Sequence, residues 1–175
     1  MKKNEQMRHS ARRRIEMDFR WPAVPFNIVL VEPSIPPNTG NIARLCAATG
    51  SVLHLVEPLG FDLSEKQLRR AGLDYWASVE LHTYPDLDAF LDRNPGGRKF
   101  LFSTAGRTSV FDVAFRPGDF LVFGNETVGL PDGLIARHPP EQVCNIPIRL
   151  DHVRSLNLSN CASIVLYEAL RQNHR

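Results

Sequence analysis

The stretch that decides the fold is Phe123-Gly124-Asn125-Glu126-Thr127-Val128-Gly129-Leu130-Pro131. It follows a short apolar run at residues 119–123, which predicts a buried strand. Pro131 and the following acid then predict the start of a short helix. Glycines at the carboxyl end of a strand let a ligand approach the backbone, and α/β sheets bind ligands at that end. An ordinary strand-to-helix turn would have the same pattern, so residues 38–44 and 146–160 are needed to distinguish a site from a turn.

Length and composition predict one globular domain. The chain has 175 residues, 43% of them apolar, which is enough for a proper core. No apolar run is long enough to span a membrane, and the basic N-terminus lacks the apolar core of a secretory signal, so we expect a cytoplasmic protein. Three cysteines without CxxC spacing predict reduced core residues, and six histidines without an HxxxH pair predict no metal site.

The charge is concentrated at the N-terminus. The formal net charge is only +2, but residues 1–20 hold seven basic residues against three acids. We therefore expect residues 1–25 to form a basic, mobile arm, and residues 26–175 to form a single domain. Two interpretations of the arm stay open, namely a segment that holds phosphates and a solvated tail.

The apolar pattern alternates between strands and helices along the domain. It predicts strands at 27–31, 52–56, 79–83, 99–103, 119–123 and 143–146. It predicts a first helix that starts at Asn38 and ends at Thr49, and a short helix that begins at Ser64. Further helices are predicted at 85–93 and 131–137. The last helix is predicted at 156–172, with Ser155 as its cap. Residues 104–109 are expected to form a polar loop. This alternation predicts an α/β fold with a mostly parallel sheet flanked by helices.

Polar residues at the start of the first helix are candidates for anion binding. Asn38, Asn41 and Arg44 are spaced at i, i+3 and i+6, which puts Asn41 and Arg44 on the side opposite the apolar stripe. An amide beside a guanidinium suits a phosphate or ribose oxygen. A solvated polar face would have the same spacing.

The last helix is apolar on most sides. One stripe is expected to face the core, and it consists of Leu158, Cys161, Ala162, Val165, Leu166 and Ala169. Ile164, Tyr167 and Leu170 lie elsewhere around the helix. A dimer interface, threading of the helix into the fold, or a tightly packed core helix would each explain the pattern.

Three motifs together resemble one known class. Asn-x-Gly-Asn-x-x-Arg at 38–44, Phe-Gly-Asn-Glu-x-x-Gly-Leu at 123–130, and Ile-Pro with Ser-Leu-Asn-Leu-Ser-Asn at 146–160 are similar to the motifs of SPOUT-class (SpoU/TrmH-like) RNA 2′-O-ribose methyltransferases. The resemblance implies S-adenosylmethionine as the cofactor, a deep C-terminal trefoil knot and a homodimer. The short chain and the segments 31–41 and 68–75 are similar to members that methylate the wobble ribose, a cytidine or uridine, in the tRNA anticodon stem-loop. Action on another tRNA position or on rRNA, and a non-catalytic RNA-binding module, are the alternatives.

The same resemblance implies the site residues. The positions that match the cofactor site are Phe102, Ser103, Gly124, Ile146, Ser155 and Leu156. The positions that match the catalytic site are Arg44, Asn38, Glu126 and Asn157, and those assigned to RNA binding are Asn41, Arg44 and Arg154.

The chemistry of these residues constrains their roles. A guanidinium does not lose its proton in a protein, so Arg44 is expected to stabilise charge, while the proton passes to solvent, a phosphate or Glu126. Two structural alternatives stay open: Glu126 as the cap of backbone amides at 127–130, and Asn157 as the cap of the last helix. Asn125 stands where we expect proline in the nearest members of the class, and we expect it to loosen its loop.

Overall fold

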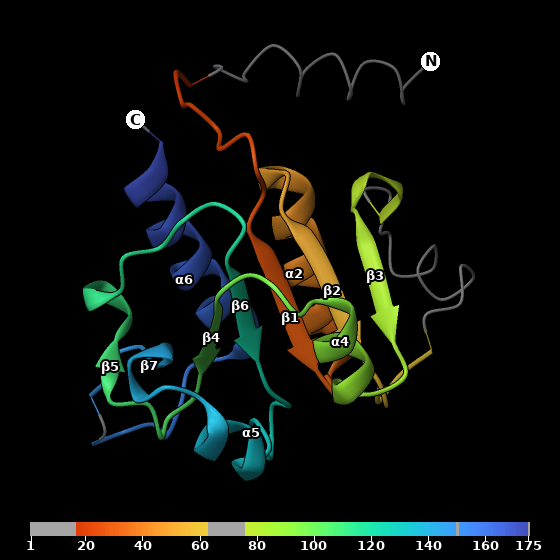
Figure 1. The fold of residues 1–175 in the computed structure, drawn as a ribbon, viewed down its shortest axis with the longest axis vertical. Coiled ribbons are helices and arrows are strands. Elements are labelled where there is room, and N and C mark those ends of the chain that lie inside the picture. The colour runs from red at the N-terminus through yellow and green to blue at the C-terminus, as the bar shows by residue number, and fades with distance from the viewer. Residues whose placement is uncertain (1–16, 63–75, 150, 175) are drawn as a thin grey trace.

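The structure, a computed structural model, describes residues 17–62, 76–149 and 151–174. A parallel sheet organises this part of the chain, with its strands in the order β3-β2-β1-β6-β4-β7-β5 (Figure 1). The strands are β1 (Asn27–Val31), β2 (Val52–Val56), β3 (Leu81–Tyr84), β4 (Lys99–Phe102), β5 (Thr108–Ser109), β6 (Phe120–Phe123) and β7 (Val143–Asn145). The predicted α/β class is confirmed. None of the described helices is long and apolar enough to cross a membrane.

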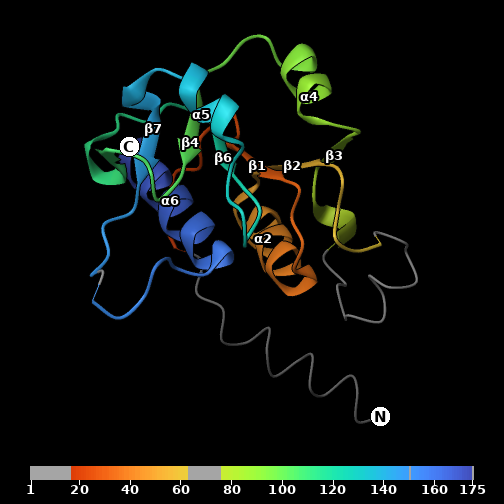
Figure 2. The same cartoon turned by 90° about the horizontal axis from the view of Figure 1, so that it is seen from below.

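The helices cover both faces of the sheet. Helices α2 (Pro36–Thr49) and α6 (Leu158–Asn173) lie on one face, and α4 (Leu87–Arg93) and α5 (Asp132–Arg137) lie on the other (Figure 2). Short 3₁₀ turns connect some of these elements, namely η1 (Trp76–Ser78), η2 (Val110–Asp112) and η3 (Pro140–Gln142). Strands covered on both faces must be apolar throughout, and this is why the inner strands have continuous apolar runs.

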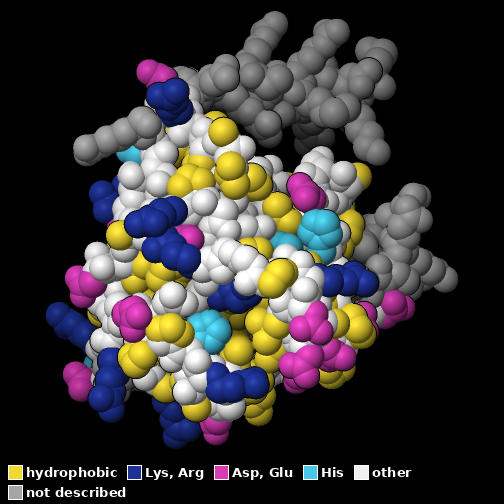
Figure 3. Space-filling model, viewed as in Figure 1, with side chains coloured by type: hydrophobic (Ala, Val, Ile, Leu, Met, Phe, Trp, Pro, Cys, Tyr) yellow, Lys and Arg dark blue, Asp and Glu magenta, His cyan; other side chains and the backbone are white. Residues whose placement is uncertain are grey.

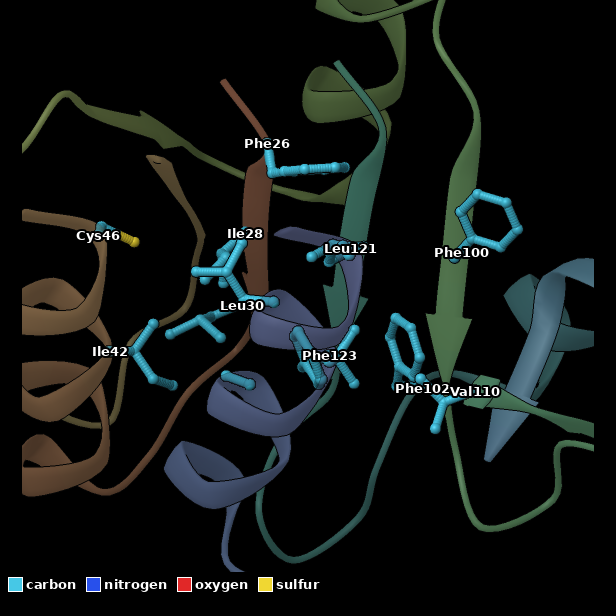
Figure 4. Packing of buried hydrophobic residues seen from close by; sticks show 14 of the residues in the cluster. Phe26, Ile28, Leu30, Ile42, Cys46, Phe100, Phe102, Val110, Leu121 and Phe123 are labelled. Atoms are coloured by element: carbon cyan, nitrogen blue, oxygen red, sulfur yellow. The ribbon is translucent and has the colours of Figure 1, made fainter. Parts of the chain in front are cut away.

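The larger part of the core lies between the sheet and the pair α2 and α6. Figure 4 shows Ile42 of α2 near Ile28 and Leu30 of β1, with Phe102 beside Phe123. The rings of Phe102 and Phe123 stack with their centroids 5.0 Å apart. A second apolar cluster lies under α4 and α5 and includes Phe90 and Leu134. The apolar residues at the carboxyl ends of β4 and β6 therefore belong to one packed unit.

The structure corrects two predicted helix starts. Helix α2 begins at Pro36, not at Asn38, because proline fits the first helical positions, where a backbone N–H has no helical partner. Asn38 therefore lies inside the first turn, where it is 4% exposed. Helix α6 begins at Leu158, and its cap is Asn157 rather than Ser155. The predicted end of α2 is confirmed, with Gly50 in the left-handed conformation at φ 68°.

Two other predictions are wrong, and two more stay untested. The pair Thr108–Ser109 forms β5, where a loop was expected, because two polar residues that join a sheet edge through β7 leave no apolar pattern in the sequence. Leu170 packs in the core and is 2% exposed, so it does not belong to an outer face of α6. The helix predicted after Ser64 lies outside the described residues. The trefoil knot stays a prediction of the resemblance.

The segment before β1 contacts the end of the chain. Phe19 packs against the core cluster, and its ring stacks on His174, with the centroids 5.1 Å apart. On the face that Figure 3 shows, basic and acidic side chains are both scattered over the surface. Among the described residues on this face, side chains of both charge signs are therefore interspersed.

His54 is a buried polar residue in the otherwise apolar strand β2. Its Nδ1 lies 2.9 Å from the hydroxyl of Tyr84, and its Nε2 lies 3.1 Å from Oδ1 of Asn27. Burial, together with the charge of the neighbouring His82, lowers the pKa of His54 to about 4 from 6.5. The folded protein therefore holds this imidazole neutral over a pH range in which the unfolded chain binds a proton.

This difference predicts a pH-dependent stability. The free energy of unfolding should be fully retained above pH 6.5 and should fall as the pH drops toward about 4, with His54 contributing up to about 1.4 kcal/mol per pH unit. His54→Gln should remove that contribution. Urea unfolding of both proteins at a series of pH values measures the two slopes, and equal slopes would contradict the assignment.

Candidate active site

The site lies at the carboxyl edge of the sheet, where the loops after β1 and β6 meet. Glu126 of the second loop accepts three hydrogen bonds from the first loop and one from the first turn of α2. Its Oε2 accepts from the backbone N–H of Ser34 at 2.9 Å and from the Ser34 hydroxyl at 3.0 Å. Its Oε1 accepts from the backbone N–H of Ile35 at 3.2 Å and from Nδ2 of Asn38 at 3.0 Å. One carboxylate therefore fixes the start of helix α2 against the loop after β6.

The same chain of bonds continues to helix α6. Asn157 donates from Nδ2 to Oδ1 of Asn38 at 2.8 Å. Oδ1 of Asn157 then accepts from the backbone N–H of Ser159 at 2.9 Å and from its hydroxyl at 2.7 Å. The network thus joins Asn38, Glu126 and Asn157, one residue from each of the three motifs.

Glu126 fixes the direction of every bond in this network. An ionised carboxylate can only accept, so Asn38 must turn its NH₂ group toward Glu126 and its oxygen toward Asn157. Asn157 must then donate to Asn38, which leaves its own oxygen to cap α6. The predicted catalytic amides are therefore held in single orientations, and the capping alternative for Asn157 is confirmed.

The protonation state of Glu126 follows from its partners. Partial burial raises the pKa of this carboxyl, but the hydrogen bonds from Ser34 and Asn38 outweigh burial and hold the pKa below its ordinary value. The group is therefore ionised at neutral pH, and four donors already occupy it. Such a carboxylate is a poor proton acceptor, which argues against one of the three acceptors considered from the sequence.

Asn125 orders the loop after β6. Its Oδ1 accepts from the backbone N–H of Thr127 at 2.8 Å and of Val128 at 3.2 Å, and its Nδ2 donates to the Glu32 carbonyl at 2.7 Å. The prediction that Asn125 loosens this loop is therefore wrong. The alternative that Glu126 caps the amides at 127–130 is also wrong, because Asn125 caps two of them and Glu126 accepts from the other loop.

Gly124 is required by the loop itself. A Cβ at this position would lie 2.2 Å from the carbonyl carbon of Gly129 and 2.3 Å from the nitrogen of Leu130. Gly129 closes the same turn in the left-handed conformation at φ 76°. The sequence predicted that a ligand would approach the backbone at this glycine, but the group that comes close to Gly124 is the backbone of its own loop. A cofactor contact at Gly124 stays a prediction.

The remaining predicted cofactor residues come from neighbouring strand ends. Phe102 ends β4, Ile146 follows β7, and Gly124 follows β6, and these three strands are adjacent in the sheet. The backbone N–H of Ser103 donates to the Cys144 carbonyl at 3.0 Å, which ties the residue after β4 to strand β7. Leu156 packs against the core cluster. The arrangement offers apolar walls beside strand-end backbone groups, which fits a purine such as adenine.

The predicted RNA-binding residues lie at the surface. Asn41 and Arg44 are exposed on α2, three and six residues after Asn38, and Arg154 and Ser155 are exposed in the segment before α6. A separate cavity of about 250 Å³ at the same edge of the sheet is lined by Val31, Glu32 and residues 128–132. Its lining includes none of the predicted site residues, although residues 128–130 belong to the second motif.

Sequence reasoning missed Ser34 and Ile35. They supply three of the four bonds to Glu126, although they are separated from it by 92 and 91 residues in the chain. Two of these bonds come from backbone N–H groups, which leave no signal in a sequence. The hydroxyl of Ser34 was indistinguishable from that of any serine in a proline-rich loop.

Comparison with known proteins is consistent with this geometry. The sequence profile of the SpoU rRNA Methylase family matches residues 25–167. The chain belongs to the SpoU methylase family. A tRNA (cytidine(34)-2′-O)-methyltransferase from Burkholderia pseudomallei is 52% identical over 149 residues, which are 84% of this chain and 95% of that protein.

Solved structures of SpoU methylases have the same fold. One from work on the 2-OH methylation of C/U34 on tRNA has a TM-score of 0.78 at 46% identity, and the match covers 85% of this chain and 96% of that one. The SpoU methyltransferase AviRb from Streptomyces viridochromogenes, in complex with AdoMet, has a TM-score of 0.73 at 26% identity over 90% of this chain and 61% of that one.

The central position of Glu126 in this SpoU methylase predicts a measurable loss on substitution. Glu126→Gln should lower the free energy of unfolding at neutral pH by about 1–3 kcal/mol, because an amide NH₂ would face the donors of Ser34 or Asn38. The folded-state pKa is lowered, so the advantage of the wild type is complete above the ordinary pKa of 4.5 and is lost as the pH falls through the lower folded value. Urea unfolding between neutral pH and about pH 4 measures it.

The matched control is Glu141→Gln, because Glu141 is an exposed acid in η3. This change should alter stability by less than about 0.5 kcal/mol. If the two substitutions lower the free energy of unfolding equally, the hydrogen bonds of Glu126 contribute no more to stability than an exposed acid does.

Proposed function

We propose that this protein is an S-adenosylmethionine-dependent methyltransferase that methylates the ribose 2′-hydroxyl of the wobble nucleotide, cytidine or uridine 34, in the tRNA anticodon loop. The observation that carries the proposal is the joining of all three motif segments by one hydrogen-bond network through Glu126, in a chain that resembles its relatives over most of its length. The relatives bear the name of this activity. A cytoplasmic location follows from a tRNA substrate.

The cofactor supplies a methyl group on a sulfonium centre. We assign its binding to Phe102, Ser103, Gly124, Ile146, Ser155 and Leu156. In the reaction the ribose 2′-oxygen forms a bond to the methyl carbon, the bond between sulfur and that carbon breaks, and the 2′-hydroxyl proton is lost. This chain's task is to hold the hydroxyl in line and to stabilise the negative charge that develops on its oxygen.

Arg44 is the proposed charge-stabilising residue. It lies exposed on α2, about two turns after Asn38, on a helix that begins near the carboxyl edge of the sheet. A guanidinium presents a fork of donors to a phosphate or a developing alkoxide and cannot serve as the base. Asn41 and Arg154, which are also exposed, are proposed to contact the RNA backbone. The proton passes to solvent or to a phosphate, since Glu126 is ionised and fully occupied.

Two other assignments compete with the wobble position. The family name refers to rRNA, and another tRNA ribose would use the same chemistry. The discriminating experiment incubates the purified protein and S-adenosylmethionine with unmodified tRNA and rRNA, and nucleoside mass spectrometry then locates the methyl group. Methylation of rRNA but not of tRNA would contradict the proposed tRNA substrate. Absence of both methyl transfer and cofactor binding would favour a non-catalytic RNA-binding module.

Arg44→Ala tests the mechanism. The variant should fold and bind S-adenosylmethionine as the wild type does, because Arg44 is on the exposed side of α2. Its methylation rate should fall by about 100-fold or more, the scale for loss of a charge-stabilising donor. Arg44→Lys should restore little, since an ammonium lacks the planar fork. Loss of cofactor binding in calorimetry, or a lower melting temperature, would instead make Arg44 structural.

We also propose that the protein is a homodimer that packs through the outer face of α6. Ile164 is 36% exposed and Tyr167 is 51% exposed, three residues apart on the same side of the helix. Ala162, Val165, Leu166 and Ala169, on the inner side, are fully buried, so this helix is apolar on both faces. A second copy of the chain would cover the outer apolar face, as the resemblance to the family implies.

Tyr167→Asp should separate such a dimer, because a charge without a partner would be buried in the interface. Sedimentation at micromolar concentration should show dimeric wild type and monomeric variant. Phe111→Asp is the control, because Phe111 is 57% exposed on η2. The proposal would be wrong if the wild type is a monomer, or if Tyr167→Asp and Phe111→Asp change the oligomeric state equally.

A further inference from the structure

Ser34 supplies two of the four hydrogen bonds that Glu126 accepts, and Ile35 and Asn38 supply one each. Ser34 donates both its backbone N–H and its hydroxyl to the same oxygen, Oε2. The other oxygen, Oε1, is thereby left to Ile35 and Asn38. Ser34 belongs to none of the three motifs, and it lies in the connection between β1 and α2.

Gly60, in the loop after β2, packs against the backbone of Ser34. A Cβ on Gly60 would lie 2.7 Å from Cα of Ser34 and 2.8 Å from its carbonyl oxygen, so only glycine fits this contact. The backbone N–H of Gly60 also donates to the Pro33 carbonyl at 3.0 Å. The position of Ser34 is therefore set by direct backbone contact on one side and by the Glu126 carboxylate on the other.

We propose that Ser34, held in place by Gly60, is a positioning residue for methyl transfer that acts through Glu126 on the amides of Asn38 and Asn157. The proposal rests on the function proposed above. With two donors on Oε2, the carboxylate plane is fixed, and Oε1 is aimed at the Asn38 NH₂ group. Without the hydroxyl, a single backbone donor holds Oε2, and the carboxylate can rotate away from Asn38.

Such a rotation of the Glu126 carboxylate would disturb the predicted catalytic amides one after the other. Asn38 would lose the acceptor that sets its orientation, and Asn157 would lose the oxygen to which it donates. Misplacement of a catalytic group by about 1 Å can lower a rate by about 100-fold. None of the assigned cofactor residues takes part in this hydrogen-bond network, so we expect cofactor binding to change little.

Ser34→Ala is the first test. The kcat for methylation of tRNA should fall about tenfold, while the KM values for tRNA and S-adenosylmethionine stay within about twofold, as for a group that acts only on orientation. Ser109→Ala is the matched control, because the hydroxyl of Ser109, at the end of β5, also makes a local hydrogen bond, in which it accepts from the backbone N–H of Phe111 and caps η2. The control should keep the wild-type kcat.

A double-variant cycle then tests the route through Glu126. In a Glu126→Gln background, Ser34→Ala should lower kcat by less than about twofold, because the partner through which it acts is already changed. A full tenfold loss in that background would show that Ser34 acts elsewhere, and would overturn the proposal.

A readout that does not depend on activity separates this proposal from the function. Carboxyl NMR titration should give a higher pKa for Glu126 in Ser34→Ala than in the wild type, since one donor that favours the ionised form is lost. Gly60→Ala should raise it as well, whereas Gly96→Ala, with open space around its Cβ, should not. If the wild type shows this titration pattern but has no methyltransferase activity, the proposed function is wrong and the coupling of Ser34 to Glu126 still holds. An unchanged Glu126 pKa in Ser34→Ala would remove the coupling itself.

Discussion

The hydrogen bonding of one carboxylate determines the arrangement of the site. Glu126 brings together two loops whose residues are about ninety positions apart in the chain. It can do so because it accepts from four donor groups on three residues. An ionised acceptor surrounded by donors also removes ambiguity from the neighbouring amides, since Asn38 and Asn157 can each be turned only one way. The cost of partly burying this charge is offset by charge-assisted hydrogen bonds.

The network exists only because the sheet is parallel. Parallel strands bring their carboxyl ends to one edge, so the loops after β1 and β6 meet although β6 comes much later in the chain. The loop after β6 then has to be compact. Gly124 allows its backbone to touch Gly129 and Leu130, and Asn125 caps two of its amides. Glu126 thus projects from a rigid support, as a residue that orients other groups requires.

Helix α6 is bound to the same network and to the core. Its first turn depends on Asn157, which caps the helix and contacts Asn38 at once. Its inner face packs against β6 and α2, with Val165 and Leu166 completely buried. A shift of this helix would therefore disturb the packed core and the candidate site together, which couples the stability of the domain to the geometry of the site.

The sequence by itself determined the class of fold, because strands buried on both faces must be apolar throughout and helices between them must have one apolar stripe. It also identified Asn38, Glu126 and Asn157 as candidates, through their resemblance to known motifs. The exact helix starts, the short edge strand β5 and the inward position of Leu170 were decided by tertiary contacts that leave no local pattern. Only the tertiary structure brought Ser34 and Ile35 to Glu126, and Gly60 to Ser34. Two of the bonds to Glu126 come from backbone N–H groups, which leave no signal in a sequence, and the partners lie far apart in the chain.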